Sequence, residues 1–211
     1  MFRAHVSLQE MVMYLLAFLI AITVHEYAHA RAALKAGDDT AKRMGRISLN
    51  PIDHMDTLGT IMFVVTMLNG FGLAWGKPVP IDPYRFKNPR WDVLKVSIWG
   101  PLSNLITAGV LAILFRFVMV PMAAVNFVLL TAICIKFNLI LAFFNMIPIP
   151  PLDGSKVLMS LMPVDHARRY EMTMGRYGMI ILLLVLFTGV AGMFIVLPTR
   201  ILFHLLTGVP M

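Results

Sequence analysis

The sequence predicts an all-α protein that crosses a membrane several times. Of its 211 residues, 59% are hydrophobic and 14% are charged, against about 45–50% and 25% in soluble domains. The mean hydropathy is +0.79, and the runs Met11–Val24 and Met179–Leu197 contain no charged residue. These properties exclude an ordinary soluble globule and indicate that a lipid bilayer surrounds the chain.

Four stretches are long enough to cross the roughly 30 Å hydrocarbon layer as helices. They are Met11–Leu34, Ser97–Val120, Ala123–Ile147 and Met179–Leu197. The apolar stretch Leu58–Leu68 is too short to span and is predicted to be re-entrant. Pro198 is expected to end the last span, which leaves residues 199–211 as a short interfacial helix. The whole chain, residues 1–211, is expected to form one integral-membrane domain.

The basic residues indicate which way the chain runs. The net charge is +7, but in so apolar a chain Lys and Arg are expected to mark cytoplasmic loops and not a nucleic-acid surface. Ten of them lie between residues 31 and 95 and four between residues 156 and 176. If Leu58–Leu68 enters and leaves on one side, all of these share that side, and the positive-inside rule places the N-terminus outside. A full crossing would weaken this bias.

The first span contains the sequence HEYAH, from His25 to His29. On a helix, positions i and i+4 lie on one face, so both imidazoles can bind one zinc ion with Glu26 beside it as a general base. Glu26 is also the only carboxylate inside a predicted span, where an unpaired charge is costly. The alternative is a purely structural role, with Glu26 paired to Arg31.

Catalytic zinc sites generally have a third protein ligand, and the sequence favours Asp153 for it. Asp153 lies in the stretch NMIPIPPLDG, whose prolines end the third span and leave carbonyls that must face protein or a water-filled cavity. The HExxH pattern lies near the C-terminal end of the first span, and Asp153 follows the C-terminal end of the third. To meet at one depth, these two spans must run parallel. This requires that Leu58–Leu68 does not cross. His54, together with Asp56, is a weaker candidate for a metal ligand.

Asn145 ends the third span, and its amide can donate two hydrogen bonds. Two roles are open to it. It can stabilise a developing oxyanion or an unwound substrate, or it can cap the carbonyls that Pro148 frees.

An extended segment is predicted after the re-entrant stretch. Residues 70–80 are rich in glycine and proline and can present an edge that pairs with an unwound substrate. A short β-hairpin is compatible with this stretch. Gly72 and Trp75 in this segment, and Asn104 in the second span, are the predicted substrate-binding residues.

Three motifs together resemble those of the site-2 protease family, which are intramembrane zinc metalloproteases of the M50 type. HEYAHA begins at His25, GPLSN runs from Gly100 to Asn104, and NMIPIPPLDG runs from Asn145 to Gly154. They match the family's HExxH, GPxxN and NxxPxPxLDG motifs in the same order. They cover a three-helix catalytic core of about residues 11–154, while the last span, at about residues 179–197, lies outside it.

The resemblance implies one zinc ion per chain, held by His25, His29 and Asp153, and catalysis by Glu26. It also implies that the substrates are transmembrane proteins, cleaved near the cytosolic face of the cell membrane in regulated intramembrane proteolysis. The PDZ and CBS modules of longer relatives are not expected in this chain. The competing class is a membrane metal transporter or an inactive relative that only binds substrates. A transporter is expected to place polar groups along a path through both leaflets, whereas here they gather toward one side.

Overall fold

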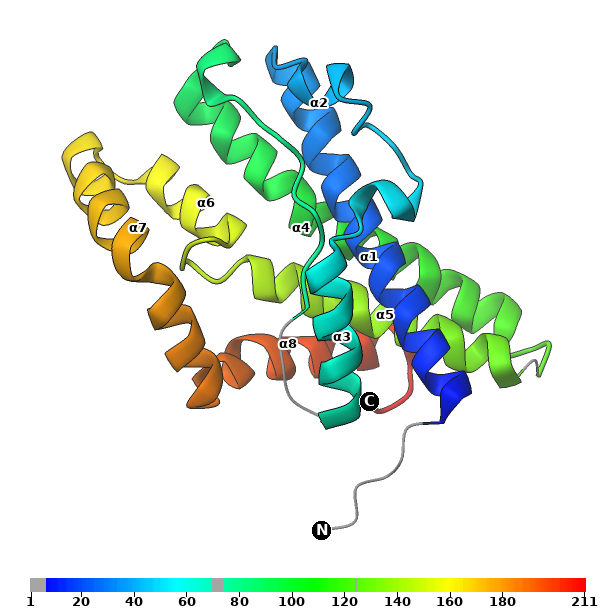
Figure 1. Cartoon of the computed structure of the whole chain (residues 1–211). Coiled ribbons are helices and arrows are strands. Elements are labelled where there is room, and N and C mark those ends of the chain that lie inside the picture. The colour runs from blue at the N-terminus through cyan, green and yellow to red at the C-terminus, as the bar shows by residue number, and fades with distance from the viewer. Residues whose placement is uncertain (1–6, 70–73, 124) are drawn as a thin grey trace.

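The structure is a computed structural model that describes residues 7–69, 74–123 and 125–211. Its α-helices are α1 (Leu8–Ala36), α2 (Thr40–Arg43), α3 (Thr57–Asn69), α4 (Pro89–Leu114), α5 (Val125–Asn145), α6 (Asp153–Leu161), α7 (Val164–Phe187) and α8 (Val190–Thr207) (Figure 1). Short turns of 3-10 helix cover Pro51–His54 and Pro83–Arg85, and a π-helical turn, Phe115–Met119, extends α4. Five helices (α1, α4 with its π-helical extension, α5, α7 and α8) are long and apolar enough to cross a membrane. The chain is therefore an all-α multi-pass membrane protein, as predicted.

Helices α1, α4 and α5 pack together and form the centre of the molecule (Figure 1). Gln9 Nε2 donates a hydrogen bond to Asn126 Oδ1 (3.0 Å) between the N-terminal ends of α1 and α5. Farther along, His25 of α1 contacts Asp153, which follows α5. Helices α1 and α5 therefore run parallel, as predicted, while the contacts of α4 with α1 run in the opposite order along the two helices.

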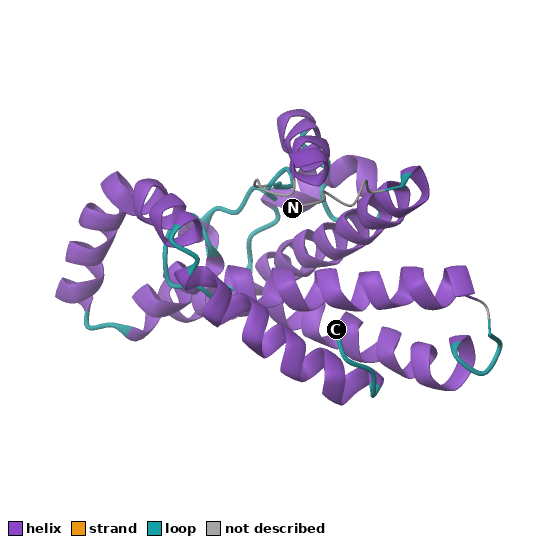
Figure 2. Cartoon of the chain, turned by 90° about the horizontal axis from the view of Figure 1, so that it is seen from below, coloured by secondary structure: helices purple, strands orange, loops and turns teal. Residues whose placement is uncertain are grey.

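Small residues allow α4 to approach α5 closely. Ala108 and Ala112 of α4 are almost fully buried in one cluster with Ile135 and Leu139 of α5. Phe203 of α8 joins this cluster, and Figure 2 shows the all-helical arrangement from below. Small interfacial residues are the usual means of close packing between membrane helices, because lipid tails provide little hydrophobic drive.

The two ends of the stretch from residue 55 to residue 76 lie side by side. The N–H of Lys77 donates to the carbonyl of His54 (2.9 Å), and Met55 and Gly76 form an isolated antiparallel bridge. Between them, α3 packs against α1, where Phe63 contacts Phe18 and Ile22. These joined ends are the geometry that a re-entrant stretch requires. The expected β-hairpin does not form among the described residues, where the pairing is limited to this one bridge.

The boundaries predicted for the last span are wrong. Instead of one helix over Met179–Leu197, α7 ends at Phe187 and α8 begins at Val190. Gly189 has a left-handed φ of 76°, a conformation that ends helices and that glycine adopts without steric cost. Pro198 lies inside α8 and does not end it, so residues 199–211 are not a separate interfacial helix. Membrane helices tolerate an internal proline more readily than soluble ones.

Candidate metal centre

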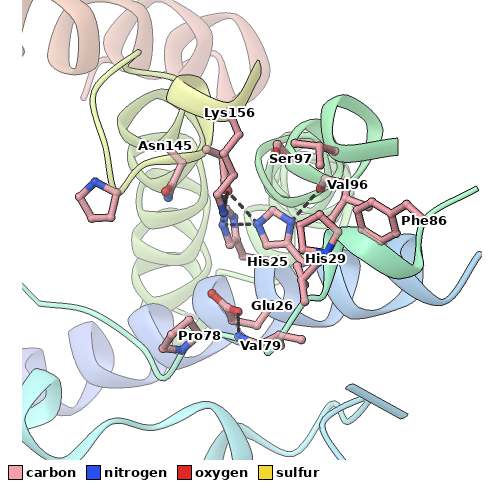
Figure 3. A pocket seen from close by; sticks show the side chains of 15 residues that line it. His25, Glu26, His29, Pro78, Val79, Phe86, Val96, Ser97, Asn145 and Lys156 are labelled. Atoms are coloured by element: carbon pink, nitrogen blue, oxygen red, sulfur yellow. Dashed lines mark hydrogen bonds and ion pairs between the residues drawn. The ribbon is translucent and has the colours of Figure 1, made fainter. Parts of the chain in front are cut away.

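Three side chains from two helices converge in the C-terminal half of α1. Figure 3 shows two of them, His25 and His29. His25 Nε2 and His29 Nε2 lie 3.0 Å apart, one turn from each other on α1. Asp153, the first residue of α6, places Oδ2 at 3.1 Å from His25 Nε2 and 3.0 Å from His29 Nε2. All three residues are buried, at 5–6% exposed. Among the described residues, this is the one group of three His, Cys, Asp or Glu side chains with ligand atoms close enough to hold a metal ion.

The other ring nitrogens show that this group fits a cation. His29 Nδ1 lies 2.8 Å from the carbonyl of Val96, and a carbonyl only accepts, so this nitrogen carries the proton. His25 Nδ1 lies 2.8 Å from Asn104 Oδ1, which is likewise an acceptor. In the neutral rings, both Nε2 atoms then direct lone pairs toward each other and toward the carboxylate of Asp153. Two imidazoles and one carboxylate are a ligand set of catalytic zinc sites. In such sites, hydrogen bonds from the other ring nitrogens hold the imidazoles in place, as Val96 and Asn104 do here.

Asn104 positions His25 and does not face a substrate. It is 0% exposed, and its Nδ2 donates to the carbonyl of Ala21 and to Asn138 Oδ1, both at 2.9 Å. Its oxygen and its amide group are thus engaged inside the helix core. This burial leaves no surface for the substrate contact predicted from the sequence. The prediction overlooked that the imidazole of a candidate metal ligand itself needs a hydrogen-bond partner.

Gly100 makes room for the imidazoles. A Cβ atom built at this position would lie 2.3 Å from His29 Nε2 and 2.8 Å from His25 Cε1. Any larger residue would displace one ring or move α4 away from α1. The sequence singled out the motif that begins at Gly100 but gave this glycine no role, because the requirement comes from a contact between two helices.

Glu26 lies beside His25, His29 and Asp153 and lines a cavity of about 260 Å³. Its Oε2 accepts a hydrogen bond from the N–H of Val79 (2.8 Å). Lys156 also lines this cavity and places Nζ at 3.8 Å from Asp153 Oδ1. Sequence reasoning missed Lys156, although its spacing of three residues from Asp153 on a helix would have indicated the contact.

Asn145 lines the same cavity. Its Nδ2 donates to the carbonyl of Leu141 in its own helix (3.1 Å). The carbonyl that Pro148 frees is that of Phe144, and it accepts instead from the N–H of Ile147 (3.1 Å). Asn145 therefore does not cap that carbonyl, and its second N–H has no hydrogen-bond partner among the described residues.

A second cavity of about 570 Å³ adjoins the metal centre and is mainly apolar. Its wall includes Trp75 from the extended segment, Phe144 from α5 and Met179 and Leu182 from α7, next to His25, Glu26 and Asn145. Trp75 thus lines a cavity that also reaches Glu26. Gly72, also predicted to bind substrate, lies outside the described residues.

The alternative metal ligands are elsewhere. His54 is 1% exposed, and its Nε2 donates to the carbonyl of Ser48 (2.8 Å). Asp56 accepts from the N–H of Gly59 at the start of α3 (2.8 Å). Neither side chain joins the group at His25.

The extended segment differs from the predicted substrate edge in one respect. The N–H groups of Lys77 and Val79 donate to His54 and Glu26, and Pro78 and Pro80 have no N–H. From residue 78 to residue 80, only carbonyls can pair with a substrate strand.

Comparison with known proteins identifies the family. The profile of peptidase family M50 matches residues 117–186, which include Asp153. The chain is 41% identical over 194 residues to "Putative zinc metalloprotease YwhC" of Bacillus subtilis (strain 168), with 87% of this chain and 83% of that protein covered. No solved structure matches significantly.

More distant relatives include proteins named "Putative zinc metalloprotease Rip2". Those of Mycolicibacterium smegmatis (strain ATCC 700084 / mc(2)155) and Mycobacterium tuberculosis (strain ATCC 25618 / H37Rv) are 28% and 30% identical. The matches cover 65% and 70% of this chain and 52% and 56% of those proteins, so the chain spans about half their length. Similarity to the Bacillus protein over most of both chains, together with the profile match, shows that this chain belongs to peptidase family M50, the site-2 protease family of zinc metalloproteases.

Proposed function

We propose that the chain is an intramembrane zinc metalloprotease that hydrolyses peptide bonds of membrane-spanning proteins. The observation that carries this proposal is the convergence of His25 Nε2, His29 Nε2 and Asp153 Oδ2 within 3.0–3.1 Å of one another. Glu26 lies beside them and faces two cavities. His25, His29 and Asp153 would hold one zinc ion per chain.

Zinc, Glu26 and Asn145 have different roles in the proposed hydrolysis. When bound, zinc acts as a Lewis acid toward the scissile carbonyl and makes water a nucleophile near neutral pH. Glu26 removes the proton of the attacking water and returns it to the leaving amine. The second N–H of Asn145 is the donor proposed for the developing oxyanion.

The two cavities suit the two partners of the reaction. The cavity of about 260 Å³ brings the polar side chains of Glu26, Asn145 and Lys156 to the metal centre, and it is the proposed route for water. The apolar cavity, with Trp75 and Met179 in its wall, suits an apolar substrate segment that has unwound, since a helix keeps its carbonyls in hydrogen bonds. These features support a transmembrane protein as the substrate class.

The direct experiment uses purified full-length protein in detergent and a peptide that contains one apolar helix. We expect cleavage that a zinc chelator abolishes and added zinc restores, with the cut near one end of the apolar segment, as located by mass spectrometry. Zinc-loaded protein that cleaves no such peptide, or cleavage that the chelator leaves unchanged, would contradict the proposal. The first of these results would favour the transporter or the inactive relative.

We also propose that the protein lies in the cell membrane with its metal centre toward the cytosolic side. Single cysteines at Asp39 and Arg85, in a Cys134→Ser background, should be shielded from an impermeant external thiol reagent. A cysteine at Ala123, between α4 and α5, should be labelled. The measurement is the fraction labelled in intact cells, with lysed cells as the control. Opposite labelling at positions 39 and 85 would show that the α3 region crosses the membrane and would contradict the orientation.

Asn145→Ala is expected to lower kcat by about 10²–10³, as for the loss of one oxyanion donor. Zinc content and thermal stability should stay near those of the wild type. Asn126→Ala, at the exposed other end of α5, is the matched control and should keep full turnover. If Asn145→Ala instead lowers stability by roughly 1–3 kcal/mol, the cost of an unsatisfied buried group, and keeps its turnover per folded molecule, the role of Asn145 is structural.

A further inference from the structure

The segment from Lys77 to Pro80 lies alongside α1 and holds the carboxylate of Glu26. Because Pro78 and Pro80 have no N–H, Val79 carries the one amide hydrogen of the Pro-Val-Pro run. That N–H donates to Glu26 Oε2 at 2.8 Å (Figure 3). The Val79 side chain is 8% exposed and packs in a cluster with residues of α1 and α2. The position of Glu26 thus depends on where this segment lies.

Arg46 fixes the start of the segment. Its Nη2 donates to the carbonyl of Lys77 (2.9 Å), and the N–H of Lys77 donates to the carbonyl of His54 (2.9 Å). Both backbone groups of Lys77 are therefore engaged. Arg46 is only 8% exposed, although it lies in a connecting loop, and arginine is rarely so buried without a specific partner.

The backbone segment that links Arg46 to Glu26 has little conformational freedom. The two prolines fix their own φ angles near −65°, so a movement of Lys77 carries the N–H of Val79 with it. On the other side of Lys77, Gly76 packs so tightly that a Cβ atom there would lie 2.5 Å from Cγ2 of Ile22 on α1. A shift of about 1 Å in a catalytic group can cost about 10² in rate.

We infer that Arg46 is a positioning residue that acts through Lys77 and Val79 to hold Glu26 at the metal centre. This inference rests on the proposed protease function. Oε2 of Glu26 is held by Val79, while Oε1 has no hydrogen-bond partner among the described residues and is free to accept the proton of water. The buried Arg46 thereby gains a role in the reaction without touching the substrate.

Hydrogen–deuterium exchange of the metal-free full-length protein tests the contact without any activity assay. In residues 78–80 the amide of Val79 is the one that can exchange, so peptide-level mass spectrometry resolves it. We expect Arg46→Met and Glu26→Ala to speed its exchange about tenfold, the effect of losing one hydrogen bond of ordinary strength. Arg43→Met, at a neighbouring exposed arginine that pairs with Asp39, should leave it unchanged. Unchanged exchange of Val79 in Arg46→Met would overturn the inference.

Kinetics then test whether the contact matters for turnover. Arg46→Met should lower kcat about 10–100-fold, with KM within about twofold and an unchanged zinc content, and Arg46→Lys should recover part of the loss. Replacing Val79 by its α-hydroxy acid removes the same N–H without changing the side chain and should lower kcat about tenfold. If Arg46→Met does not fold, Arg46→Lys tests the contact with Lys77 and this replacement tests the contact of Val79 with Glu26; wild-type kcat in either variant would overturn the inference.

The double variant separates positioning from independent effects. If Arg46 acts through Val79, Arg46→Met combined with the Val79 ester should be no slower than the slower single variant. Losses that multiply, or wild-type kcat in the ester variant, would overturn the inference. If the wild-type protein itself cleaves nothing when loaded with zinc, the proposed function fails, whereas the exchange of Val79 still reports on the contact.

Discussion

Asp153→Ala is expected to lose most of the bound zinc and at least about 10³ in kcat/KM, because two histidines alone make a poor zinc site. Asp153 Oδ2 lies within 3.1 Å of both imidazole nitrogens and is buried with them, and no other carboxylate of the described residues joins this group. Metal analysis of the purified protein, together with the peptide cleavage assay, measures both effects.

Asp165→Ala is the matched control, since Asp165 is exposed in the first turn of α7. It should keep about one zinc per chain and full activity. Normal zinc content in Asp153→Ala would show that another residue completes the site. His54 is then the first residue to test, although its Nε2 is engaged by the carbonyl of Ser48.

Gly100→Ala is expected to damage the metal centre through a single methyl group. The added Cβ would lie 2.3 Å from His29 Nε2, so the ring must turn or α4 must move away from α1. We expect zinc affinity to fall about 10–100-fold, as for disruption of the layer that orients metal ligands, and kcat/KM to fall about 10²-fold from misplacement of about 1 Å.

The same change at Gly109, also on α4, is the control. Nothing lies within 4 Å of a Cβ atom built there, and alanine favours a helix over glycine by about 1 kcal/mol. Gly109→Ala should therefore keep its zinc and its activity. A Gly100→Ala protein that binds zinc as tightly as the wild type would show that α4 does not press on the imidazoles.

The parts of the site that follow from local chain geometry could be predicted from the sequence. His25 and His29 share a helix face because they are four residues apart, and Asp153 was indicated by the prolines that end α5. The parallel direction of α1 and α5 followed from requiring these residues to meet. Each of these predictions needs only the residue spacing within one helix or the number of times the chain crosses the membrane.

The contacts between distant segments could not be predicted in this way. The burial of Asn104 against His25, the closeness of Gly100 to the rings and the hydrogen bond from Val79 to Glu26 depend on how helices pack, which residue spacing does not reveal. The break at Gly189 was missed for a different reason. Hydropathy stays high across Met179–Leu197, and a one-residue left-handed turn does not interrupt it.

The most direct test of the account is the Glu26→Gln variant, measured for zinc and for cleavage in the same preparation. Glutamine keeps the size of the side chain and an oxygen that can accept from Val79, but it cannot take a proton from water. We expect about one zinc per chain and a kcat lowered by about 10²–10⁴, the usual contribution of a general base. The exposed Glu171→Gln should cleave normally. Zinc-loaded Glu26→Gln with near-normal turnover would contradict the assignment of Glu26 as the general base.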